Sequence, residues 1–132
     1  MTPPPLRRPG LWRFLGWTLV LTVVYLSLTP KPPPTGVQFG DKIGHLAAYA
    51  ALMGWWLQIH RRPERLALIF VLMGLAIELL QSLSGFRTGD IFDMAANTLG
   101  VGLGWASARL MPDWLARLDR RLPSASPASK TS

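Results

Sequence analysis

The chain has 132 residues, which leaves room for one domain. Only 16% of them are charged and 49% are apolar, whereas a soluble domain carries roughly 25% charged residues, so long apolar segments must account for the difference. The absence of cysteine excludes disulfides and thiolate metal sites. The net charge of +7 would suit nucleic acid, but the basic residues lie between and beyond the apolar segments, and we therefore expect no nucleic-acid partner.

Four apolar segments follow one another along the chain, at residues 11–28, 43–59, 66–83 and 91–110. Each is close to the roughly 20 residues that a helix needs to cross a bilayer. Pro30 follows the first segment and Pro112 follows the fourth, and proline ends helices. All four are apolar nearly all round, which suits lipid better than the half-solvated surface of a soluble bundle. The sequence therefore predicts an all-α, polytopic membrane protein with four transmembrane helices in a compact bundle.

The remaining segments are short tails around this transmembrane domain, which covers residues 11–112. Residues 1–10 form an N-terminal tail, and residues 113–132 form a basic tail that we expect to be partly disordered. The stretch 114–122 predicts a short amphipathic helix on the membrane surface, with Trp114 and the leucines toward lipid and the arginines toward headgroups. The first apolar segment is long for a secretory signal peptide and no small-residue cleavage site follows it, so we expect an uncleaved span.

The distribution of basic residues predicts the orientation. Lysine and arginine favour the cytoplasmic side of short loops. Eleven of the fourteen basic residues fall at the N-terminal end, between the second and third segments, or after the fourth, and these regions share one side of a four-span protein. Lys31, Lys42 and Arg87 fall on the other side. Both termini are therefore expected in the cytoplasm.

Nine polar or ionisable residues lie in or beside the spans, all at the ends expected to face outward: Asp41, Lys42, His45, Glu78, Gln81, Arg87, Asp90, Asp93 and Asn97. Intramembrane groups of this kind are costly and are candidates for function, so we expect one outer-leaflet site. Asp41 and His45 are four residues apart and share a helix face. Glu78 lies among leucine and isoleucine and needs a proton, a cation or a partner, for which Arg87 is the expected counter-charge.

The fourth segment carries a pattern that predicts close helix packing. Gly100 and Gly104 form a G-x-x-x-G pair, which lets two helices approach closely. Asp93 and Asn97 lie on the same face and are therefore expected to point into the bundle. A structural interpretation stays open for some of these residues, because Asp41 and Asp90 are also suitable helix N-caps and amide side chains often hold helices together.

These residues form two ordered blocks. The first is DKIGHLAAY at residues 41–49, and the second joins IELLQ at 77–81, Arg87, and DMAANTLG at 93–100. With both blocks in this order, the chain resembles the VanZ-like family over roughly residues 40–104. The family often has Pro-Gly before the loop arginine, where this chain has Ser84-Gly85-Phe86.

The resemblance implies a protein of the bacterial plasma (inner) membrane, because the family is named for a protein linked to glycopeptide resistance, notably to teicoplanin. One hypothesis is a site for an anionic lipid-linked envelope precursor or a glycolipid headgroup, with Lys42 and Arg87 on phosphate or carboxylate. A second is an enzyme acting on such a lipid, with His45 as acid or base and Asp93 or Glu78 orienting it. A third is a structural or assembly role without a ligand. A divalent cation is compatible with the first two, held by Asp41, His45, Glu78 and Asp93.

Overall fold

The computed structural model describes residues 4–29, 40–85 and 90–124, and these residues are all-helical, without strands. The prediction of an all-α fold is confirmed. The helices are α1 (Pro9–Leu28), α2 (Gly40–Ile59), α3 (Pro63–Ser84), α4 (Ile91–Leu110) and α5 (Trp114–Arg121). The first four begin and end within three residues of the four apolar segments.

Local sequence accounts for most of the helix ends. Pro9 and Pro63 begin α1 and α3, where the missing N–H of proline costs no helical hydrogen bond. Gly85 ends α3 with φ of 72°, a left-handed conformation that favours glycine. Asp90 caps α4, because its Oδ1 accepts a hydrogen bond of 2.8 Å from the Phe92 N–H. Asp90 is therefore an N-cap, although it also pairs with Lys42, whereas Asp41 lies inside the first turn of α2 and is not its cap.

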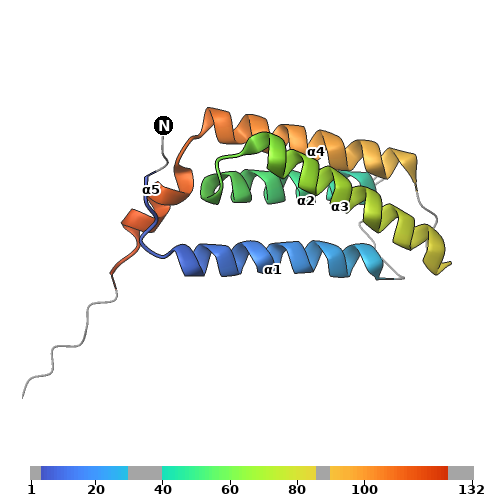
Figure 1. Ribbon diagram of the computed structural model, residues 1–132, viewed down its shortest axis with the longest axis horizontal. Coiled ribbons are helices and arrows are strands. Elements are labelled where there is room, and N and C mark those ends of the chain that lie inside the picture. The colour runs from blue at the N-terminus through green and yellow to red at the C-terminus, as the bar shows by residue number, and fades with distance from the viewer. Residues whose placement is uncertain (1–3, 30–39, 86–89, 125–132) are drawn as a thin grey trace, which may run out of the picture.

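Helix α2 is the centre of the bundle and packs against each of the other described helices (Figure 1). The C-terminal ends of α1 and α3 and the N-terminal ends of α2 and α4 lie at one end of the bundle, which we call the site end (Figure 1). Helix α5 lies at the opposite end, beside the start of α1. The core is built largely from α2 and its neighbours, with Tyr49, Leu52 and Met53 at 0–1% exposure.

Helices α2 and α4 make the closest contact in the bundle. A Cβ at Gly100 would lie 2.5 Å from the Leu46 carbonyl oxygen, and one at Gly104 would lie 2.5 Å from that of Ala50. Real Cβ atoms do not come so close to backbone, so only glycine allows this approach. By contrast, Gly102 has nothing within 4 Å of its Cβ position. The two helices are thus joined through one glycine face of α4.

By length and composition, α1 and α3 are the described helices that could cross a membrane. Helices α2 and α4 are as long but less apolar, because their turns carry small and polar residues that face other helices. The outward faces of α1 and α3 expose large apolar side chains, including Phe14, Leu21 and Leu79. An apolar exterior with the polar side chains buried between helices is the pattern expected of a protein that lies in lipid.

A helix forms where the sequence predicts one, as α5, but one of its faces is buried in protein. Leu115 is 0% exposed, so the expectation that the leucines of this stretch face lipid is wrong for this residue. Trp114 packs edge-to-face against Trp55 of α2, with ring centroids 5.8 Å apart. The carboxylate of Asp119 accepts a hydrogen bond from the Arg7 backbone N–H. Helix α5 therefore packs against the bundle and is hydrogen-bonded to the segment before α1.

Candidate functional site

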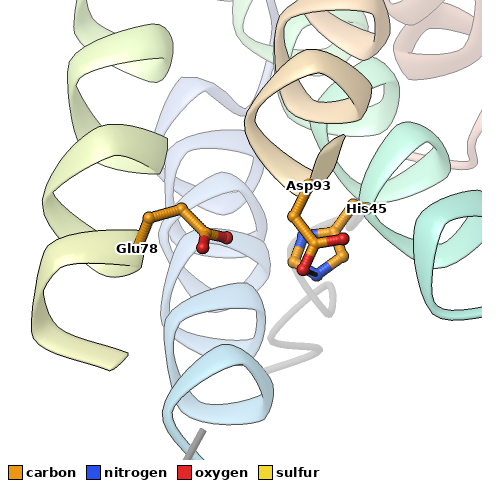
Figure 2. Close-up of side chains that lie close together, drawn as sticks. All are labelled: His45, Glu78 and Asp93. Carbon is orange, nitrogen blue, oxygen red and sulfur yellow. Dashed lines mark ion pairs between the residues drawn. The ribbon is translucent and has the colours of Figure 1, made fainter. Parts of the chain in front are cut away.

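Three chemically reactive side chains meet at the site end of the bundle. His45 comes from α2, Glu78 from α3 and Asp93 from α4, and each offers a ligand atom within 4.8 Å of the other two. Figure 2 shows the Glu78 carboxylate pointing from α3 toward Asp93 and the His45 ring. Glu78 and Asp93 are 4% and 5% exposed, so neither is a surface charge. The structure thus brings together the three residues that we named as catalytic candidates.

The His45 ring is held at both nitrogens. Its Nδ1 lies 2.9 Å from Asn97 Oδ1, and its Nε2 lies 3.6 Å from Asp93 Oδ2. Both partners are on α4, four residues apart and therefore on the same helix face. Gly100 continues that face and allows α4 to lie against α2. The close packing of the two helices is what sets the distance between the ring and its partners.

Glu78 connects α3 to the start of α4. Its Oε2 accepts a hydrogen bond of 2.9 Å from the Asp90 backbone N–H. Its Oε1 is inaccessible to solvent and has no hydrogen-bond partner within the described part of the chain. A buried carboxylate oxygen without a partner carries a large desolvation cost. Glu78 therefore brings an uncompensated carboxylate oxygen to the site end of the bundle.

Lys42 is surrounded by acidic residues. Its Nζ lies 3.0 Å from Asp90 Oδ2, 3.2 Å from Asp93 Oδ1 and 3.5 Å from Asp41 Oδ2. The hydrogen bond from Lys42 holds the pKa of Asp90 below its usual range. The charge of Lys42 is therefore already matched by carboxylates. This contact argues against the expectation that Lys42 is available to meet a phosphate by itself.

The other predicted residues occupy different parts of the site end. Asp41 is 48% exposed in its side chain and contacts Lys42, but it is not one of the three clustered residues. Gln81 is 2% exposed, and its Nε2 donates to the Ser27 carbonyl oxygen at 2.5 Å, which ties α3 to α1. Arg87, the expected counter-charge, lies outside the described residues.

One residue that the sequence analysis did not single out also shapes the site. Gly74 lies on α3, one turn before Glu78. A Cβ there would lie 3.1 Å from Asn97 Nδ2 and 3.3 Å from the Tyr49 hydroxyl, so its absence leaves room for both polar groups. Helical spacing could have identified this residue from the sequence, because Gly74 is four residues before Glu78 and so shares its helix face.

The profile of the VanZ/LLP1 family matches residues 10–112 of the chain. The protein belongs to the VanZ/LLP1 family. The match includes α1 to α4 and every residue of the site described above. The resemblance found in the two polar blocks is therefore confirmed, and the VanZ/LLP1 region of this chain is the helical bundle itself.

An uncharacterised protein of the yeast Schizosaccharomyces pombe is 33% identical to this chain over 91 residues, which cover 64% of this chain and 54% of that protein. The chain thus spans about half the length of this curated relative. No solved structure matches. A relative in a yeast means that similarity of this kind is not restricted to bacterial cell envelopes.

Proposed function

We propose that this VanZ/LLP1 protein is a multi-pass protein of the bacterial plasma membrane and binds the polar headgroup of a lipid at its site end. The observation that carries the proposal is a buried polar cluster at one end of a bundle with an apolar exterior. Helices α1 to α4 have 20–22 residues and so extend about 30 Å, the thickness of the hydrocarbon core. When all four helices span the bilayer, the cluster lies at the depth of the lipid headgroups.

The orientation follows from charge. Helix α5 and the start of α1 lie at the end opposite the cluster, together with most of the basic residues. The positive-inside preference therefore supports cytoplasmic termini and a cluster in the outer leaflet. Cysteine introduced at Thr35 is expected to react with an impermeant maleimide in whole cells, whereas cysteine at Ser126 is expected to stay unlabelled. The reverse pattern would refute this orientation.

The chemistry of the cluster indicates what kind of headgroup fits. Four carboxylates are present in the described part of the site, from Asp41, Glu78, Asp90 and Asp93, against the single ammonium of Lys42. Carboxylates accept hydrogen bonds, so hydroxyls and amines of a glycolipid headgroup are suitable direct ligands. The phosphate of a lipid-linked envelope precursor needs an additional positive group beside Lys42. Arg87 is one such group in the sequence, and a bound cation is another.

Native mass spectrometry from mild detergent tests the headgroup proposal. Wild-type protein is expected to retain a lipid that the Asp93→Asn variant loses. Glu64→Gln is a matched control, because Glu64 is exposed at the opposite end of the bundle. Wild-type protein without any bound lipid would favour the structural or assembly role. The family name also motivates comparing teicoplanin susceptibility with and without the gene.

A second function is favoured by the contacts of His45. A histidine held by Asn97 at one nitrogen and facing a carboxylate at the other resembles an acid–base group with its orienting partner. We propose as the alternative that the protein chemically modifies the lipid it binds. In that case, the lipid that accumulates in cells expressing His45→Ala should differ in mass from the lipid found with wild type. Identical lipid in both would remove this alternative.

A further inference from the structure

The ligand atoms at the site end match the preferences of a transition-metal ion. His45 offers an imidazole nitrogen, and Glu78 and Asp93 offer carboxylate oxygens, each from a different helix. Zn²⁺ ligands at about 2.1 Å in a tetrahedral arrangement lie about 3.4 Å apart. The 3.6 Å between His45 Nε2 and Asp93 Oδ2 is close to that spacing and too long for a good hydrogen bond.

Glu78 supplies an independent indication of a ligand. The residue is 4% exposed, and its Oε1 has no hydrogen-bond partner among residues 4–29, 40–85 and 90–124. The other oxygen is occupied by the Asp90 N–H, so the carboxylate cannot turn away without breaking that bond. A fixed, buried and unpartnered carboxylate oxygen is strongly destabilising in apolar surroundings unless a positive group compensates it.

The contacts of the His45 ring point in the same direction. When Nδ1–H donates to Asn97 Oδ1, the Nε2 atom carries a lone pair. That lone pair faces the carboxylate of Asp93, so two electron-rich atoms point toward each other. A proton or a cation between them is needed to make this arrangement favourable. Orientation of a histidine through its second nitrogen is also the usual arrangement around a protein-bound metal.

We infer that His45, Glu78 and Asp93 bind one divalent transition-metal ion of the Zn²⁺ or Mn²⁺ type. A mixed set of one imidazole and two carboxylates suits these ions better than Mg²⁺ or Ca²⁺, which prefer oxygen ligands alone. This inference goes beyond headgroup binding and does not require a lipid to be present. A metal here also supplies the positive charge that the four carboxylates lack, and so allows a phosphate-bearing headgroup to approach.

Isothermal titration of the full-length, tag-free protein with Zn²⁺ and with Mn²⁺ in lipid-free detergent tests the site. We expect saturable binding of one equivalent of at least one of these ions, with Mg²⁺ and Ca²⁺ binding more weakly. Glu78→Gln should abolish it, whereas Glu64→Gln, at the other end of the same helix, should not. Asn97→Ala leaves all three ligands in place and should weaken binding roughly 10- to 100-fold, because Asn97 only positions the His45 ring.

Two outcomes would overturn the inference. One is the absence of saturable Zn²⁺ or Mn²⁺ binding by wild-type protein, a result that needs no variant to fold. The other is binding that persists in folded Glu78→Gln and Asp93→Asn variants, which would place the metal elsewhere. Since the titration contains no lipid, a failure of the headgroup proposal would leave its result unaffected.

Discussion

The pair α2 and α4 differs from the pair α1 and α3 in composition and in how closely its two helices pack. Helices α1 and α3 are apolar enough to cross a membrane by composition and turn large side chains outward. Helices α2 and α4 are of similar length but carry glycine, histidine and carboxylates, and they lie directly against each other. The comparison teaches that average hydropathy identifies the most apolar helices, whereas two of the three clustered side chains, His45 and Asp93, come from the two helices that pack most closely together.

Helix α3 shows that this difference belongs to faces rather than to whole helices. Its outward side exposes Leu72 and Leu79, while Gly74, Glu78 and Gln81 lie inward, within the same four turns. Because the polar residues are few and share one face, the helix stays apolar on average. A helix can therefore resemble an ordinary membrane span in composition and still contribute a buried carboxylate to the site.

Breaking the contact between α2 and α4 is expected to have the largest effect. In Gly104→Leu, the new Cβ would lie 2.5 Å from the Ala50 carbonyl oxygen and 2.7 Å from Met53 Cβ, so the helices must separate. We expect a loss of about 3 kcal/mol of stability, the top of the usual range for overpacking. Thermal unfolding in detergent measures it.

The same helix provides the control. Gly102 has open space at its Cβ position, so Gly102→Leu changes composition equally without entering the interface. We expect this variant to unfold near the wild-type temperature. Equal destabilisation by both variants would contradict the claim that only one face of α4 packs closely against α2.

Much of this fold follows from the sequence. Apolar runs of the right length predict the helices, and prolines and glycine mark their ends. The pairing of helices does not follow, because Gly100 and Gly104 indicate a close partner without saying which helix it is. The central place of α2 depends on contacts with all the other described helices, and hydropathy contains no information about them.

Charged side chains also join the start of α2 to the start of α4. Lys42→Met removes the ammonium between Asp90 and Asp93 and should lower the unfolding temperature at pH 7, by less than Gly104→Leu does. The hydrogen bond from Lys42 lowers the pKa of Asp90, so this contribution to stability is present above the unfolded pKa of about 3.9. It is lost as the pH falls further, through the folded-state value.

We therefore expect the difference between wild type and Lys42→Met to shrink when unfolding is measured at pH 3 instead of pH 7. Lys42→Arg keeps the charge and should restore part of the stability at pH 7. A difference that stays constant from pH 7 to pH 3 would show that the apolar part of the lysine side chain, rather than its charge, holds the two helix ends together.

The site was predictable in its members but less so in their roles. The order and direction of the predicted spans placed His45, Glu78 and Asp93 at one depth, and the structure gathers them. Lys42 was expected to meet phosphate, but it pairs with Asp90 and Asp93, which are 48 and 51 residues away in sequence. Such pairings depend on how α2 and α4 are juxtaposed, so the sequence alone indicates a charged residue without indicating its partner.

The smallest effect on the bundle is expected at its opposite end, where α5 packs on α2. Burial opposes ionisation of Asp119, but the Trp12 side chain and the backbone N–H groups of Arg7 and Arg8 outweigh it and lower its pKa. In Asp119→Asn the carboxylate that holds Arg7 is lost, so trypsin should cut the Arg7–Arg8 bond faster. The net value of a hydrogen bond to a charged group corresponds to roughly tenfold or more in cleavage rate.

Asp113→Asn is the matched control for this last variant, because Asp113 pairs with Arg61 and is only partly buried. The rate at which trypsin cleaves Asp113→Asn after Arg7 should match that of wild type. Both variants should unfold within a few degrees of the wild-type temperature, since neither touches the contact between α2 and α4. If Asp119→Asn instead unfolds at as low a temperature as Gly104→Leu, the contact between α5 and the segment before α1 is as important to the fold as the glycine face of α4. The distinction between the closely packed pair α2 and α4 and its surroundings would then have to include α5.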